Sequence, residues 1–222
     1  DVGEPGTGRV QPMTMMVLLN GLHEDDLLAA GYIKGKGKDG STAEDAKKKL
    51  HAEIRRAGID ASYSSPNFFS IRPDLCAMMV NHQYGVSALD AAQVTAATLE
   101  ARQEVHRIID SLRASGGIWA KVRIAATPAQ IGIREGRRIH GLYTLTKDDL
   151  VQGAQFEDGV CTVRFVVDVH SLVKGEGGGY GNGGVKMKPY QIPLRSLIAK
   201  DVSNLMMAGR CISGDFYAHA SY

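Results

Sequence analysis

The chain has 222 residues, of which 44% are hydrophobic and 23% are charged, so it can form one large globular domain or two small ones. Its 26 basic and 24 acidic residues leave a formal net charge of +2, which gives no electrostatic reason to expect a nucleic acid or a membrane as partner. No apolar run approaches the roughly 18 residues that a membrane-spanning helix needs, and no signal peptide opens the sequence.

The cysteines and histidines bear on the compartment and on metals. Cys76, Cys161 and Cys211 are widely spaced and form no C-x-x-C pair, which is typical of free thiols in a reducing compartment. A cytoplasmic location is therefore expected. The seven histidines form no H-x-x-x-H or H-E-x-x-H pair, so no metal site is predicted.

The first elements are a strand and a helix. The short, unbroken apolar run from Met13 to Leu19 indicates a buried strand, because helices need longer periodic stretches. A helix is expected over about 42–57. Ser41 and Glu44 have the spacing of a capping box before it, and Gly58 is a natural stop after it.

The longest predicted helix covers about 88–114, after Ser87 and Asp90 and before the "SGG" at 115–117. One apolar face repeats at helical spacing along its length: Val94, Ala97, Ala101, Val105, Ile108 and Leu112. A second apolar face in the first half consists of Leu89, Ala92, Ala96 and Leu99. The first half is therefore expected to pack on two sides.

The second half of the chain has β character. Strands are predicted in "IWAKVRIAA" (118–126) and "GLYTL" (141–145), and Thr146 begins a brief helix. The strongest strand signal is "GVCTVRFVVDVH" (159–170), with five valines between Val160 and Val169. A last strand is expected to lead into the turn at Gly209. This order of elements favours an α+β or mixed α/β enzyme domain.

Two glycine-rich segments match G-x-G-x-x-G literally. "GKGKDG" (35–40) precedes a helix, but no hydrophobic strand delivers it, so a solvated loop is preferred to a dinucleotide site. "GEGGGYGNGG" (175–184) has no helix after it and is interpreted as a flexible loop, or as a mobile flap if it is functional.

Several motifs taken in order resemble one family. They are "GRVQPMTMMVLLNGL" near the N-terminus, then "IREGRRIHGLYTLTKDDL", "VVDVH", "YQIPLRSL" and "NLMMAGRCISGDFYAHASY". Together they resemble FAD-dependent oxidoreductases related to the fumarate reductase and succinate dehydrogenase flavoproteins. The resemblance is dense over 128–222, good over 8–22 and thin over 23–118.

The resemblance implies a particular organisation. Such proteins carry an N-terminal strand–G-x-G-x-x-G–helix for the ADP part of FAD and a helix after the final glycine turn, and this chain shows neither. It is therefore expected to be a substrate-side fragment of a two-domain flavoprotein. The strand segment 1–22 would return from the FAD domain, 23–170 would form the substrate (cap) domain, and 171–222 would hold a flexible loop and part of the FAD-binding domain.

The resemblance also implies cofactor-binding residues in the last turn. Gly209 and Arg210 would approach FAD closely, which glycine permits sterically, although a plain strand-ending glycine is the alternative. Cys211, Ser213 and Gly214 would continue the turn and donate hydrogen bonds to the flavin or pyrophosphate. Cys211 is interpreted as a packed small residue rather than a redox thiol, because no second cysteine is near in sequence.

The candidate catalytic residues are cationic or titratable. His219 would lie beside the flavin and could shuttle protons, with a packed histidine as an equal alternative. Arg137, Arg138 and Arg195 could hold a carboxylate substrate or the charge of a reduced flavin. Side chains alternate along a strand, so at least one of Arg137 and Arg138 is expected to be structural, paired with Glu135 or another acid.

His170 is the remaining candidate, at the end of the valine-rich strand. Asp168 lies two positions earlier and would share its face, an arrangement in which an acid orients a base. A structural Asp–His hydrogen bond that closes the strand is the alternative.

The function expected from the resemblance is hydride transfer between a small-molecule substrate and FAD. FAD would belong to the complete protein and be absent from this fragment, which would be inactive alone. The competing interpretation is a non-catalytic folded module without cofactor that self-associates, so a homo-oligomer is possible.

Overall fold

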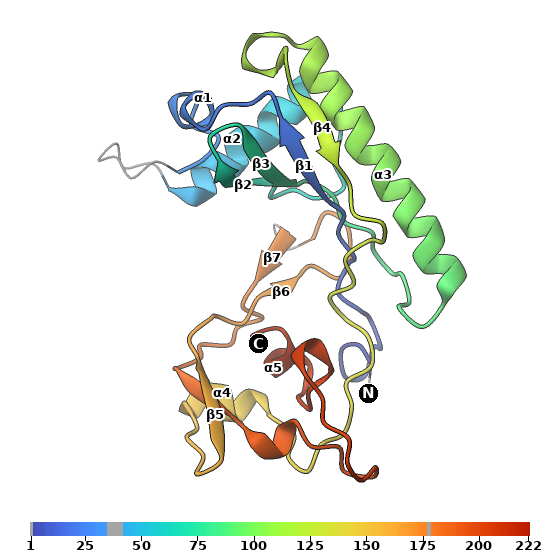
Figure 1. Cartoon of the computed structure of the whole chain (residues 1–222), viewed down its shortest axis with the longest axis vertical. Coiled ribbons are helices and arrows are strands. Elements are labelled where there is room, and N and C mark those ends of the chain that lie inside the picture. Colours follow the sequence, from blue (N-terminus) through green and yellow to red (C-terminus); the bar gives the residue numbers. More distant parts are fainter. Residues whose placement is uncertain (1, 35–41, 177–178) are drawn as a thin grey trace. The chain divides into compact units, whose positions relative to one another are not determined.

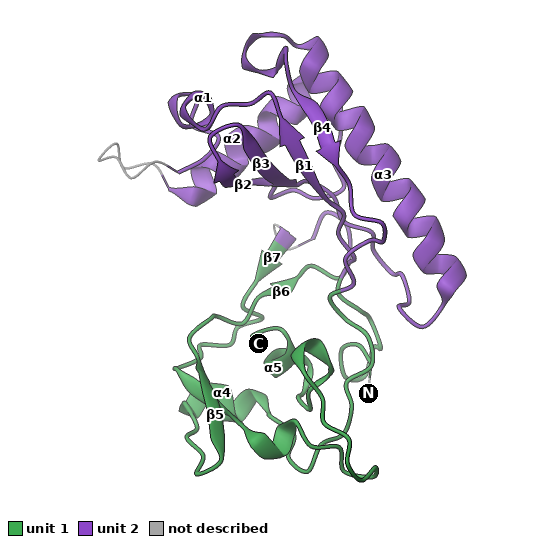
Figure 2. Cartoon of the chain, viewed as in Figure 1, with its two compact units in different colours: residues 1–11, 134–172, 180–222 green, residues 12–133, 173–179 purple. Residues whose placement is uncertain are grey.

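The computed structural model describes residues 2–34, 42–176 and 179–222. The fold is mixed α and β with antiparallel sheets, which confirms the predicted class. Two compact units are present (Figure 2): unit 1 comprises residues 1–11, 134–172 and 180–222, and unit 2 comprises 12–133 and 173–179. The division into 1–22, 23–170 and 171–222 stays a prediction. The loop 35–40 and residues 177–178 of the second glycine-rich segment lie outside the described residues.

Unit 2 is built on a four-stranded antiparallel sheet in the order β2-β3-β1-β4. The central pairing joins β1 to β3, with Leu18 opposite Ala77. Figure 1 shows the sheet with its helices. The elements of this unit are β1 (Met16–Asn20), α1 (Glu24–Ala29), α2 (Ala43–Arg56), β2 (Asn67–Arg72), β3 (Leu75–Met79), α3 (Ala91–Ala114), the 3-10 turn η1 (Gly117–Trp119) and β4 (Arg123–Ala126).

The core of unit 2 lies between the sheet and helices α2 and α3. Leu50 of α2 and Ile108 of α3 pack with Leu19 of β1 and Met78 of β3, and none of these four side chains has exposed surface. Burial of such side chains contributes about 1.5–3 kcal/mol each. The apolar periodicity of α3 thus accounts for its packing.

The helix starts follow from short polar side chains. α2 begins after Thr42, whose hydroxyl accepts from the Asp45 amide while the Asp45 carboxylate accepts from the Thr42 amide. This capping box lies one residue after the predicted one, whose Ser41 is outside the described residues. α3 begins after Asp90, whose carboxylate accepts from the amides of Ala92 and Gln93.

The expectation that the first half of α3 packs on two sides is wrong. Leu89 is 49% exposed and Leu99 is 53% exposed, and Ala92 and Ala96 between them are also exposed. Only the face that carries Ala101 and the residues in register with it enters the core, because the helix meets the sheet along a single stripe.

Unit 1 has shorter elements and a second core. Tyr190, Leu145 and Leu150 are fully buried in it. Its elements are α4 (Lys147–Gln152), β5 (Gly159–Val163), β6 (Val169–His170), β7 (Tyr180–Gly181), β8 (Tyr190–Pro193), the 3-10 turns η3 (Leu194–Ser196) and η4 (Gly209–Cys211), and α5 (Phe216–His219). The predicted start of the brief helix is observed: Thr146 and Asp149 form a capping box.

The valine-rich segment 159–170 is not one strand. β5 pairs with β8 until Val163 meets Tyr190, and the residue before Tyr190 is Pro189, which has no amide to continue the ladder. The chain then bonds elsewhere: the Asp168 amide donates to the Ala220 carbonyl at 2.9 Å.

Three other predicted strands are shorter than expected. In 118–126 the first two residues belong to η1, which follows Gly116 and begins at Gly117, both with positive φ, and only Arg123–Ala126 is a strand. Segment 141–145 makes isolated bridges, and the segment before Gly209 makes a single bridge, Ile198 to Met206.

Two leucines of α3 test the core. Leu112→Ala is expected to lower the free energy of unfolding by about 2–5 kcal/mol, because Leu112 is fully buried and truncation leaves a cavity. Leu99→Ala on the exposed face of the same helix should change it by less than about 0.5 kcal/mol. Urea unfolding followed by circular dichroism measures both, and equal losses would contradict the one-sided packing of α3.

Candidate functional site

The last turn and the C-terminal residues lie against two cavities in unit 1. The polar cavity, of about 320 Å³, is lined by Gln11, Arg134, Phe165, Asp168, Arg210, His219, Ala220, Ser221 and Tyr222. The apolar cavity, of about 380 Å³, is lined by Ile192, Leu197, Ala208, Gly209, Arg210, Ile212 and Tyr222. Arg210 and Tyr222 line both, so the apolar cavity and the polar cavity lie next to each other.

Backbone hydrogen bonds hold the turn in place. The Ser213 amide donates to the Ser196 carbonyl at 2.9 Å, and the Leu145 amide donates to the Ser213 carbonyl at 3.1 Å. Asp215 caps α5, and its carboxylate accepts from the amides of Ala218 and Lys147 at 2.8 and 2.6 Å. Segments distant in sequence therefore fix the residues in which the turn ends.

The predicted cofactor-binding residues separate into open and closed positions. Gly209 has φ +61°, and a Cβ built on it would meet no atom within 4 Å. Arg210 and Cys211 beside it are exposed. By contrast Ser213 is buried with its hydroxyl 2.9 Å from that of Thr144, and a Cβ on Gly214 would stand 2.4 Å from the Tyr222 hydroxyl oxygen. The open part of the turn is thus Gly209–Cys211.

His219 is buried between the turn and the C-terminus. It is 2% exposed, its Nε2 lies 3.1 Å from the Arg210 carbonyl oxygen, and its ring centroid is 5.8 Å from that of Tyr222. A carbonyl can only accept, so the proton is assigned to Nε2. Nδ1 then carries a lone pair, and it has no hydrogen-bond partner among the described residues.

The environment of His219 keeps the ring neutral. Its pKa is lowered from 6.5 to about 4, mainly by burial and also by the positive charge of Arg138, while the hydrogen bond to the Arg210 carbonyl opposes the shift. A base with such a pKa takes up a proton poorly near neutral pH. This favours the packed-histidine alternative over the proton shuttle.

Arg138 and Glu135 form a buried ion pair. Their side chains are 5% and 0% exposed, and an Arg138 N–H donates to Glu135. A second Arg138 N–H donates to the Gly3 carbonyl at 2.9 Å, and the other Glu135 oxygen accepts from the Gln11 amide at 3.0 Å. Arg138 therefore has the structural role that was expected of at least one of the two arginines.

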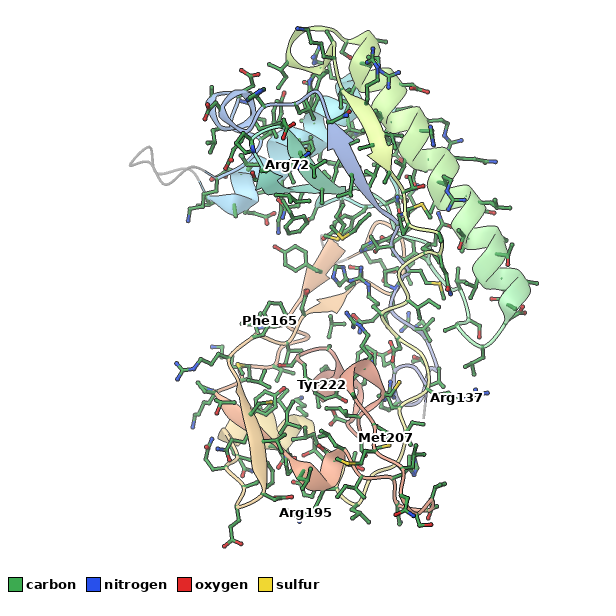
Figure 3. All side chains as sticks on the ribbon, viewed as in Figure 1. Arg72, Arg137, Phe165, Arg195, Met207 and Tyr222 are labelled. Atoms are coloured by element: carbon green, nitrogen blue, oxygen red, sulfur yellow. The ribbon has the colours of Figure 1, made fainter. Side chains whose placement is uncertain are left out.

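The other candidate arginines lie at the surface. Arg137 is exposed (Figure 3), whereas Arg138, the next residue, is buried. The Arg195 guanidinium makes two hydrogen bonds to the Asp158 carboxylate, at 2.9 and 3.2 Å, and lies 5.2 Å from the centre of the Tyr143 ring. Arg137 and Arg195 line neither the polar nor the apolar cavity.

His170 and Asp168 lie together, as the spacing predicts. His170 Nε2 is 3.5 Å from an Asp168 carboxylate oxygen. His170 is 5% exposed, whereas the Asp168 side chain is 30% exposed and lines the polar cavity. The sequence suggests that Asp168 orients His170, but Asp168 is the one of the two that faces the polar cavity.

Gln11 and Tyr222 are site residues that the sequence did not point to. Gln11 lies 124 positions from Glu135 and 159 from His170, its two hydrogen-bond partners. No local pattern signals contacts over such separations. Tyr222 belonged to a quoted motif, but its contact with both cavities depends on how the chain folds back after α5.

Breaking the buried ion pair should destabilise the chain. Glu135→Gln is expected to lower the free energy of unfolding by about 3–5 kcal/mol, because it leaves the Arg138 charge buried beside a neutral amide. Asp158→Asn, which removes the partner of the exposed Arg195, is the matched control and should cost much less. Thermal unfolding measures the stability of both variants. A larger loss of stability in Asp158→Asn than in Glu135→Gln would contradict the structural role of the buried ion pair.

His219 should make stability depend on pH. Its pKa is about 4 in the folded state and near 6.5 when unfolded, so the unfolded chain binds more protons between these values. Stability should therefore fall by up to about 3 kcal/mol as pH decreases from 6.5 to 4. His219→Gln should flatten this dependence, while His106→Gln, at an exposed histidine, controls for loss of an imidazole. Urea unfolding across this range measures the slope; the same flattening in both variants would refute the assignment.

Two further features of the described residues bear on function. None of their helices is both long and apolar enough to cross a bilayer. No group of three His, Cys, Asp or Glu side chains comes together among them as a metal site would require.

Comparison with known proteins gives one match. No curated protein and no solved structure matches this chain. The family model of the FAD dependent oxidoreductases matches residues 1–222, over the turn, the cavities and both units. The chain belongs to the FAD-dependent oxidoreductase family.

Proposed function

We propose that the chain forms the substrate-facing part of an FAD-dependent oxidoreductase, with the flavin held at the turn Gly209–Cys211 and a small-molecule substrate in the polar cavity. When bound, FAD would take a hydride from a substrate C–H bond or deliver one to a double bond. The observation that carries the proposal is the open side of Gly209 on an apolar cavity, in a chain matched by this family over its whole length.

The residues at the turn fit a flavin. Gly209 leaves free the space that a side chain would fill, so a flat ring can approach the backbone. Ile192, Leu197 and Ile212 give the cavity an apolar lining for the hydrocarbon part of the ring. Arg210 lies where the apolar and polar cavities meet, and its guanidinium suits the negative charge of a reduced flavin.

His219 and Tyr222 would support this arrangement without exchanging protons. Neutral His219 holds the Arg210 carbonyl through Nε2, and the Tyr222 hydroxyl donates to the Ile212 carbonyl at 3.2 Å. These two bonds span the turn from Arg210 to Ile212. They fix the backbone on both sides of Cys211, which is the part that would face the cofactor.

Asp168 is the better candidate for handling a substrate proton. Its carboxylate lines the polar cavity, and the His170 ring lies behind it at 3.5 Å. A carboxylate held in this way can accept a proton or orient a hydroxyl of the substrate. In this proposal His170 positions Asp168, which reverses the roles expected from the sequence.

A second candidate function is a non-catalytic module that self-associates. It is favoured by exposed apolar side chains next to the polar cavity: Phe165 is 59% exposed and Val166 is 57% exposed. Exposed apolar surface of this kind is typical of association sites. Failure of the chain to bind added FAD, together with a concentration-dependent dimer in light scattering, would favour this function.

Gly209→Ala tests the flavin site. The added methyl group would occupy the open space and strain a residue with φ +61°, so the affinity for FAD should fall by at least about tenfold. Gly6→Ala is the matched control, because Gly6 has φ +82° and an equally open side but lines neither cavity. FAD titration followed by quenching of flavin fluorescence gives the affinities.

The result has two readings. A loss in Gly209→Ala with no loss in Gly6→Ala would support the site. Equal affinities in the two variants, or no FAD binding by the unaltered chain, would overturn it.

A further inference from the structure

Gln11 is a buried residue whose side-chain oxygen accepts a hydrogen bond, while its side-chain amino group donates none to a described residue. It is 4% exposed and lines the polar cavity. Its carbonyl oxygen Oε1 accepts from the His170 amide at 3.0 Å, and its own backbone amide donates to Glu135 at 3.0 Å. Both ends of the residue are therefore fixed by groups that are themselves buried.

These contacts determine which way the carboxamide points. A backbone N–H can only donate, so the atom that faces the His170 amide must be the Gln11 oxygen. The Nε2 amino group then lies on the other side of the carboxamide. It makes no hydrogen bond to any described residue, and it is not among the fully buried side-chain atoms that lack a partner, so it keeps some accessible surface. The small accessible part of Gln11 therefore includes its Nε2 amino group, and since Gln11 lines the polar cavity, we place these two N–H donors at the cavity.

The charged residues around the cavity favour the same kind of ligand. Two arginines, Arg134 and Arg210, and one acid, Asp168, line it, and an Arg210 N–H donates to the Arg134 carbonyl at 3.2 Å. The lining is therefore net positive and rich in donors. A ligand that carries acceptor oxygens and negative charge could accept from the Gln11 amino group and pair with the positive charge of the arginines.

We propose that Gln11 is a binding residue whose Nε2 group donates to an oxyanion, a carboxylate or a phosphate, of the ligand in the polar cavity. The identification of that ligand as a substrate rests on the proposed function, whereas the binding itself does not require flavin. Small acidic molecules are the ligand class that this donor set selects.

The experiment uses the whole chain without FAD, titrated separately with acetate and with inorganic phosphate. In nitrogen–proton correlation spectra the Gln11 side-chain amide pair is identified by its absence in Gln11→Glu. This pair should shift and saturate with at least one of the two anions. A stronger response to acetate assigns a carboxylate ligand, and a stronger response to phosphate assigns a phosphate ligand.

A matched pair of variants tests the energetic role. Gln11→Glu keeps an acceptor for the His170 amide but replaces the donors by negative charge, so anion affinity should fall at least about tenfold. Gln103→Glu makes the same change on the exposed surface of α3 and should leave affinity unaltered.

Two results would overturn the proposal: a Gln11 amide pair that does not respond to either anion, or an equal loss of affinity in both variants. The first needs no variant, so it holds even if Gln11→Glu folds poorly. Because no FAD is present, failure here leaves the flavin site at Gly209 standing. Anion binding in a chain that does not bind FAD would instead remove the proposed function alone.

Discussion

The buried ion pair between Glu135 and Arg138 is the interaction on which unit 1 depends. Arg138 reaches the N-terminal segment through the Gly3 carbonyl, and Glu135 reaches it through the Gln11 amide. Gln11 in turn holds the His170 amide. Three separate stretches of the chain are thereby joined around one pair of charges, which would be costly to bury without these partners. Through Gln11 this network reaches the polar cavity, whose positive charge comes from Arg134 and Arg210.

Local physical chemistry explains which elements could be predicted. The long helix α3 could be predicted because Asp90 caps it and apolar residues repeat at helical spacing. The start of the brief helix α4 could be predicted at Thr146, which caps it together with Asp149. The lengths of the strands could not be predicted, because a strand ends where its partner strand ends. The stop after Val163 is set by Pro189, a residue 26 positions away that no window on the valine-rich segment includes.

The candidate site shows the same division. The turn at Gly209 could be predicted because its residues are contiguous and resemble a family motif. The choice between Arg137 and Arg138 could be framed from the alternation of side chains but not resolved, since it depends on which one meets Glu135. The weak basicity of His219 and the orientation of Gln11 arise from burial and from distant carbonyl, carboxylate and amide groups. These are properties of the folded chain rather than of any segment.

The make-up of the two units has a consequence for how the chain is synthesised and folds. Almost all of unit 2 is one continuous stretch, 12–133, whereas unit 1 combines residues 1–11 with 134–172 and 180–222. On the ribosome, unit 2 can collapse once its own stretch has emerged, because its contacts need little from later residues. The N-terminal segment must wait for partners made more than a hundred residues later, and such long loop closures slow folding. Formation of the cavity that contains Gln11 is therefore expected to follow the folding of unit 2.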